Sequence, residues 1–322
     1  MQRLFLKSAW WPLAIGASIL LIGALAAYGS GNFDRTTTLP RSFDTFRQLV
    51  GINLVLILSP AFLVTTTGYL HRRSLRLLAQ LPAPIDQAAL RARIHAPARW
   101  LWCAAIAGAL YGIFFNLPIR SVEQLFADGA RTFTLIVLMV LVWIWAGLVI
   151  AIRIHVSGLF LEAGRSANLD PFDLRSVYPI ATSGNGDIVL CLGAMAIVSL
   201  QSIDANFRYQ NYLYASLVAI PAATALWLRP MLGVRAQLRA FKRQALHEVN
   251  EHISTASRDL RPAPINGLES LLQRRDRIRA VRDWPVDMAL LGRVLVICVI
   301  PPAAWVAAAL VENLVDAWLG GG

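Results

Sequence analysis

The sequence predicts an all-α membrane protein, a polytopic bundle of about seven transmembrane helices with a helical hairpin before the last span. Of its 322 residues, 57% are hydrophobic and only 15% are charged, whereas soluble domains are about 45–50% apolar and about 25% charged. The apolar residues gather in runs of about 20, the length that crosses a hydrocarbon core of about 30 Å. Because backbone groups in lipid must bond within their own segment, we expect these runs to be helices.

Seven runs are long and apolar enough to be spans. They cover residues 9–28, 49–70, 100–118, 133–154, 187–206, 212–229 and 288–317. Tryptophans stand near many of their ends, as the aromatic belt of a membrane interface predicts. The first run is longer than the apolar core of a signal peptide, about 7–15 residues, so we interpret it as a span. The predicted organisation is a bundle of six spans over 1–229, a hairpin over 230–287 and a last transmembrane helix within 288–322.

The fifth span has the least certain beginning. Residues 178–187 contain Pro179, Ser183, Gly184 and other residues too polar for a helix that faces lipid. We therefore start the helix at Asp187, whose side chain would act as its N-cap. The alternative is a broken helix in which Ser183 to Asp187 lie inside the membrane and line a cavity.

The charge distribution predicts the orientation of the chain. The formal net charge is +11, and all but two of the 30 basic residues are arginines. If the N-terminus is cytoplasmic, 24 of these 30 fall on the cytoplasmic side of the predicted spans. The positive-inside rule then places the N-terminus in the cytoplasm and the C-terminus outside, which is the periplasm for the bacterial inner membrane that we expect. This rule explains the basic excess, so no nucleic-acid partner is expected.

The segment 230–287 is predicted to be a cytoplasmic helical hairpin rich in arginine. Apolar residues recur at steps of three and four from Val234 to Ile253, which indicates a first amphipathic helix, and a second helix follows over about 267–283. The second helix carries four arginines that could bind a cytoplasmic protein or anionic lipid headgroups: Arg274, Arg275, Arg277 and Arg279. Before the third span, Asp86 is predicted to cap another short amphipathic helix, with Ile85 packing back on it.

Three short motifs resemble a group of uncharacterised bacterial multi-spanning inner-membrane proteins. They are the tetrapeptide Trp284-Pro285-Val286-Asp287 before the last helix, the end of that helix over 309–316, and the segment 173–175. The resemblance covers about a third of the chain. It implies a polytopic membrane protein and no particular activity.

Several residues are candidates for an ion path. Glu312 and Asp316 are four apart, so they share one helix face at the outer end of the last span and could attract cations. Pro301 and Pro302 should interrupt the middle of that helix, as the broken helices of transporters do. Asn53 makes the second span polar, and Asp187 lies at the uncertain start of the fifth.

Enzyme motifs are weak. Gly184-Asn185-Gly186-Asp187 matches the GxGD tetrapeptide of intramembrane aspartyl proteases, but a second aspartate in a neighbouring span is not evident. His247 and His252 are five apart, whereas a zinc-binding HExxH motif needs a spacing of four on one helix face. The three cysteines fall in apolar runs without CxxC spacing. We expect no catalytic residues, no metal and no cofactor.

Three functions remain open. The first is a channel or transporter, assembled as a homo-oligomer, with the last span and spans two and five lining the path. The second is a membrane scaffold or signalling protein whose basic hairpin binds a cytoplasmic partner or anionic lipid. The third is an intramembrane aspartyl protease centred on Asp187.

Overall fold

The computed structural model describes residues 10–35, 45–81, 85–94, 100–116, 129–166, 178–198, 200, 209–258 and 265–280, and the regular secondary structure of these ranges is all helical. The predicted all-α class is therefore confirmed. The helices are α2 (Trp11–Gly29), α3 (Phe46–Ala79), α4 (Gln87–Ile94), α5 (Leu101–Asn116), α7 (Gly129–Ser166), α8 (Tyr178–Ser183), α9 (Asn185–Val198), α10 (Tyr209–Arg258) and α11 (Ile265–Ala280).

Five helical stretches of the described chain are long and apolar enough to cross a membrane. They are Trp11–Gly29, Phe46–Ala79, Gly129–Ser166, Tyr178–Val198 and Ser216–Thr255. They overlap the predicted spans one, two, four, five and six. The predicted third span corresponds to a shorter apolar helix, Leu101–Phe114. The predicted seventh span lies outside the described residues, so the structure supports a membrane-embedded helical bundle without fixing the number of spans at seven.

Large apolar side chains cover the outside of this bundle. Ile22 on α2 is 67% exposed, and Ile106 on α5 and Phe133 on α7 are each 59% exposed. A contiguous surface of this kind is unfavourable in water, whereas lipid tails solvate it well. Trp10 and Tyr28, at the two ends of α2, are also exposed, where aromatic rings can reach the two membrane interfaces.

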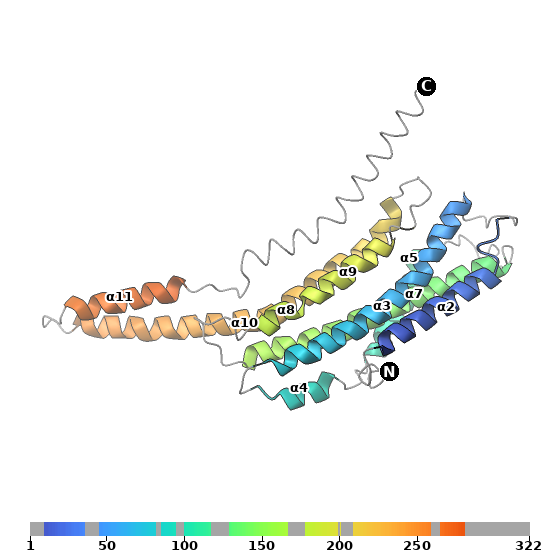
Figure 1. Cartoon of the computed structure of the whole chain (residues 1–322). Helices are drawn as coiled ribbons and strands as arrows, with labels where there is room; N and C mark the ends of the chain where they lie inside the picture. Colours follow the sequence, from blue (N-terminus) through green and yellow to red (C-terminus); the bar gives the residue numbers. More distant parts are fainter. Residues whose placement is uncertain are drawn as a thin grey trace, which may run out of the picture.

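Helix α3 forms the centre of the bundle, where it contacts α2, α7 and α9, and Figure 1 shows α2, α3 and α7 running side by side. Small residues allow the closest helix contacts. A Cβ on Gly108 of α5 would meet the carbonyl oxygen of Trp143 on α7, and a Cβ on Gly147 would meet that of Ala104. Such close backbone contact is the usual way in which helices associate inside membranes, where the hydrophobic effect does not drive them together.

One end of the bundle has a compact core built from α3, α4, α7, α8 and α10. Its buried side chains include Leu78, Phe160, Ile180 and Val234. Asp86 caps α4 as predicted, since its Oδ1 accepts a hydrogen bond from the Ala89 N–H at 2.9 Å, and Ile85 packs against the core. An exposed ion pair of 2.7 Å between Arg93 Nη1 and Glu162 Oε1 joins α4 to α7, and this hydrogen bond raises the pKa of Arg93.

The predicted hairpin is present, but its first helix is not separate from the sixth span. Helix α10 runs unbroken for 50 residues through Pro221 and Pro230, and α11 packs against its distal part. Figure 1 shows α10 extending well beyond the bundle with α11 beside it. No helix end marks residue 230, and the boundary between bundle and hairpin expected there stays a prediction. Gly233 lies against the backbone of Leu161 on α7, and this packing stabilises the helix where a proline removes one backbone hydrogen bond.

The fifth span begins earlier than predicted and is interrupted. Residues Tyr178–Ser183 form α8, a turn follows at Gly184, and α9 starts at Asn185. The expected helix start at Asp187 is therefore wrong, and the alternative of a broken helix is closer to the structure. The polar residues of α8 are tolerated because Ile180 to Ser183 are all buried against protein and do not face lipid.

A buried ion pair at a helix break as the candidate functional site

An ion pair between α7 and α9 is buried inside the bundle. The guanidinium of Arg153 donates two hydrogen bonds to the carboxylate of Asp187, from Nε to Oδ1 at 2.5 Å and from Nη2 to Oδ2 at 3.1 Å. The two residues are 2% and 1% exposed. A two-point contact of this kind is the strongest pairing available to these groups, and it fixes their relative orientation.

A third helix completes the coordination of Arg153. The Oγ of Ser74 on α3 accepts a hydrogen bond from Arg153 Nη1 at 3.2 Å and donates one to the carbonyl of Leu70 at 2.9 Å. The neighbouring Arg73 adds a second positive charge that acts on Asp187. Charged groups inside a membrane are costly and are functional candidates by default, so this cluster is the first place to look for a function.

The turn at Gly184 positions Asp187. The carbonyl of Gly184 accepts hydrogen bonds from the N–H groups of Asp187 and Ile188, at 3.0 and 3.3 Å. A Cβ on Gly184 would lie 2.7 Å from the Cα of Trp227, so only glycine lets the turn approach α10 this closely. The turn thereby directs the first residues of α9 toward α3 and α7. The side chain of Asp187 pairs with Arg153 and is not an N-cap.

Buried polar residues continue from this pair along one face of α3. Thr67, His71 and Ser74 recur at steps of four and three, the spacing of a single helix face, and they are 8%, 4% and 2% exposed. Asn53 occupies the same face nearer the start of α3 and is fully buried. Its Nδ2 donates to the carbonyl of Leu49 at 2.8 Å, and its Oδ1 accepts from Asn32 Nδ2 at 3.3 Å.

The far end of this face is closed by the residues that follow α2. The guanidinium of Arg131, at the start of α7, donates hydrogen bonds to the carbonyl oxygens of Gly31 and Asp34. Gly31 has a φ of 77°, a left-handed conformation that favours glycine. Arg131 thus holds the turn after α2 against α7, next to the pair of Asn32 and Asn53.

The structure brings together only part of the residues predicted as a path. Asp187 and Asn53 both lie in the interior on the described helices, whereas Glu312, Asp316, Pro301 and Pro302 lie outside the described residues. The four hairpin arginines are on α11, remote from the ion pair. Sequence reasoning missed Arg153, Ser74, Thr67 and His71. A charged residue within an otherwise apolar run, as at Arg153, was the available signal.

The enzyme motifs find no support in the described part of the chain. The charged side chains that act on Asp187 there are arginines, whereas an aspartyl protease needs a second carboxylate that shares a proton with the first. His247 pairs with Glu251 at 3.5 Å on an exposed helix face, and the described residues contain no cluster of His, Cys, Asp and Glu able to hold a metal.

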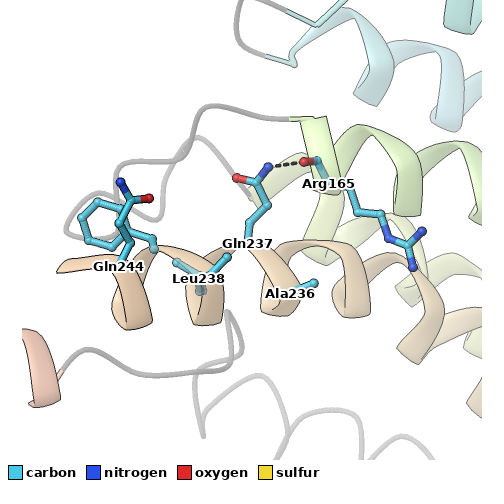
Figure 2. Close-up of a pocket in the computed structure, with 7 residues that line it drawn as sticks. Arg165, Ala236, Gln237, Leu238 and Gln244 are labelled. Atoms are coloured by element: carbon cyan, nitrogen blue, oxygen red, sulfur yellow. Dashed lines mark hydrogen bonds between the residues drawn. The ribbon is translucent and has the colours of Figure 1, made fainter. Parts of the chain in front are cut away.

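A cavity of about 440 Å³ lies where α10 leaves the bundle, beside the end of α7. Figure 2 shows the amide of Gln237 bonded to the backbone carbonyl of Arg165, whose guanidinium extends away from Gln244. The described residues that line this cavity are alanines, Leu238, Phe241, two glutamines and Arg165, and none of them is an acid, a histidine or a nucleophile. Its chemistry therefore does not indicate an active site.

The fold and the buried site are those of an all-helical bundle with several helices long and apolar enough to cross a membrane and with a charged pair in its interior. No protein-family model, curated protein or solved structure matches this chain.

Proposed function

We propose that the protein is a channel or transporter whose path follows the buried polar face of α3. The observation that carries the proposal is the length of this face. Asn53 and Ser74 are 21 residues apart, which corresponds to about 32 Å along a helix at about 1.5 Å per residue. A hydrocarbon core is about 30 Å thick, so these polar residues stand near the two ends of the apolar thickness, with Leu56, Pro60 and Leu63 buried on the same face between them.

The composition of this face favours transport over packing. A bundle that only needs to hold together can use small and apolar residues on its inner faces, as α5 and α7 do around Gly108. Thr67, His71 and Ser74 instead carry groups that can both donate and accept hydrogen bonds. Between them and Asn53, Pro60 cannot bond to the carbonyl of Leu56, which leaves an additional acceptor on α3.

The pair of Arg153 and Asp187 then serves as the closed end of the path. The pair joins α7 to α9 and is bonded to Ser74 on α3, and the turn at Gly184 gives α9 a point about which its first residues can move. Separation of Arg153 from Asp187 would expose both side chains to the polar face of α3. When the two side chains are paired, they block this end of the path. Interrupted helices are used in this way at the substrate sites of transporters.

The remaining expectations from the sequence belong to this proposal. The protein acts as a homo-oligomer in a bacterial inner membrane, with the N-terminus and the hairpin in the cytoplasm. Glu312 and Asp316 attract cations at the outer mouth, and the helix interrupted at Pro301 and Pro302 lines the outer part of the path.

The test is transport by the purified protein in proteoliposomes, with dyes that report proton, potassium, sodium and chloride flux. Thr67→Val keeps the shape of the side chain and removes its hydroxyl. An ion or solute that passes Thr67 in this variant loses one hydrogen-bonding partner, which costs about 1–3 kcal/mol. Since this cost adds to the barrier for transport, we expect flux to fall about tenfold or more.

Thr224→Val is the matched control, since Thr224 is exposed on the apolar part of α10 and donates a hydrogen bond to the carbonyl of Ile220 in its own helix. Flux should be unchanged in this variant. If Thr67→Val and Asn53→Leu both fold with wild-type unfolding midpoints and conduct at the wild-type rate, the proposed path is wrong. If the wild-type protein carries none of these ions, the proposal that it is a channel or transporter for them is wrong.

A further inference from the structure

The charges of the hairpin are separated along its length. We define the hairpin base as residues 235–243 of α10 with 274–279 of α11, and the hairpin tip as 244–255 with 268–273. The base contains eight cationic side chains: Arg235, Arg239, Lys242, Arg243, Arg274, Arg275, Arg277 and Arg279. Its one acidic residue, Asp276, pairs with Arg275 at 3.6 Å. Within these bounds the tip has no lysine or arginine and carries Glu248, Glu251 and Glu269, while Arg258 and Arg261 follow it in the sequence beyond residue 255.

The antiparallel packing of the two helices creates this separation. Helix α11 lies beside the distal part of α10 and runs back toward the bundle, as Figure 1 shows. Val249 and Ile278 are buried, whereas Arg274, Arg277 and Arg279 are exposed. The last turn of α11 therefore adds its arginines to the same length of the hairpin as the basic residues of α10.

The base lies where α10 leaves the apolar region. Between Ser216 and Gly233 the only charged residue is Arg229, and the basic residues begin at Arg235. At about 1.5 Å per residue, Arg235 to Arg243 extend about 3–15 Å beyond Gly233. The headgroup layer occupies about 5–8 Å on each side of the hydrocarbon core, so the base begins within this layer. Basic residues farther along the helix lie beyond this layer, and their long side chains can turn back toward the lipid phosphates.

We infer that the hairpin base binds the headgroups of anionic lipids in the membrane that the protein spans. The surface has the sign that complements these headgroups, and it lies at their level. Phe241, 42% exposed, and Leu232, 44% exposed, lie beside the cations on α10. Exposed apolar side chains among basic ones are typical of helices at a lipid interface.

The charge separation disfavours a second copy as the occupant. Two copies in one membrane project their hairpins on the same side. A twofold axis along the membrane normal would therefore place one base against the other, and their like charges would repel each other. Pairing of base with tip would require copies in opposed membranes. Lipid binding is independent of the proposed transport, because the base shares no residue with the face of α3.

The experiment measures energy transfer from the native tryptophans to a fluorescent lipid in proteoliposomes that contain the full chain. A labelled phosphatidylglycerol and a labelled phosphatidylcholine are compared at equal density. We expect preferential transfer to the anionic probe that weakens as salt is raised. Since each cation near such a surface contributes about fivefold, Arg277→Gln with Arg279→Gln should lower the apparent affinity at least about fivefold.

Arg35→Gln with Arg47→Gln is the matched control, because it removes the same charge from two exposed arginines that follow α2 and begin α3, at the other end of the bundle. This variant should keep the preference of the wild type. The inference is wrong if the wild type does not prefer the anionic probe, or if both double variants lower the preference equally. It is also wrong if Gln273→Cys of separate copies forms an intermolecular disulfide whatever the lipid, since a second copy then packs directly against this part of the hairpin.

Discussion

At the scale of single residues, the energetics of Arg153 and Asp187 depend on their being together. Moving either ion out of water alone costs several kcal/mol, and only a partner with good geometry offsets this cost. Both carboxylate oxygens and three guanidinium nitrogens have partners within 3.2 Å. Each residue is therefore stable in the interior only while the other is present.

We predict that Asp187→Asn destabilises the protein by about 3–5 kcal/mol, because it leaves the charge of Arg153 buried and uncompensated. Reversible unfolding of the detergent-solubilised protein measures this loss. Glu251→Gln is the control, since the pair of His247 and Glu251 is exposed and should contribute no more than about 1 kcal/mol.

A double variant separates the cost of an unpaired charge from the cost of a disturbed helix break. Arg153→Met with Asp187→Leu removes both charges and keeps apolar volume, so it should be clearly more stable than Asp187→Asn alone. If the double variant is at least as unstable as the single one, the pair does not determine the stability of this region. The position of Asp187 in the turn after Gly184 would then be the important feature.

Sequence reasoning found Asp187 but not its partner. Arg153 lies near the end of the predicted fourth span, over 133–154, whereas α7 continues as a helix to Ser166. Arg153 and Asp187 are 34 residues apart, and no local pattern connects them. The pairing results from the packing of α7 on α9, which only the three-dimensional structure contains.

At the scale of elements, close contact of α5 with α7 depends on missing side chains. We predict that Gly108→Ala destabilises the protein, because the new Cβ would overlap the backbone of Trp143 and force the two helices apart. Overpacking of this kind typically costs about 1–3 kcal/mol. The same unfolding measurement, with cysteine cross-linking between α5 and α7 as a second observable, tests it.

Gly29→Ala is the matched control, because a Cβ there would have no neighbour within 4 Å. In a helix, alanine is favoured over glycine by about 1 kcal/mol, so this variant should be neutral or more stable. Equal effects of the two substitutions would show that helix propensity, and not the contact of α5 with α7, determines the outcome at Gly108.

The existence of the helices was more predictable than their ends. The first six apolar runs, the amphipathic period from Val234 to Ile253 and the cap at Asp86 are local features, and in the described residues each corresponds to a helix or a helix start. The continuity of α10 through Pro230 and the helical state of Tyr178 to Ser183 are not local. Both depend on packing against other helices, which stabilises residues that isolated segments would leave outside a helix.

At the scale of the whole molecule, the two ends of the bundle differ in construction. One end has the core around Phe160, the short helix α4 and the hairpin, with its basic base. The other has the turn after α2 and the first turn of α3, where Arg35 and Arg47 are exposed. This asymmetry fits the positive-inside rule, with the hairpin in the cytoplasm, and it makes the orientation testable with one residue at each end.

We predict that Gln273→Cys on α11 and Arg35→Cys after α2 react on opposite sides of the membrane, in a background where Cys103, Cys191 and Cys298 are serine. Both positions are exposed, so a membrane-impermeant maleimide should reach each one from its own side. Arg35→Cys should be labelled in intact spheroplasts, and Gln273→Cys only in inverted vesicles.

Ile106→Cys, exposed on the apolar surface of α5, should resist labelling in both because lipid covers it. Labelling of Gln273→Cys in spheroplasts alone would reverse the orientation and place the hairpin outside. Labelling of Ile106→Cys from either side would mean that water, and not lipid, covers the apolar surface of α5.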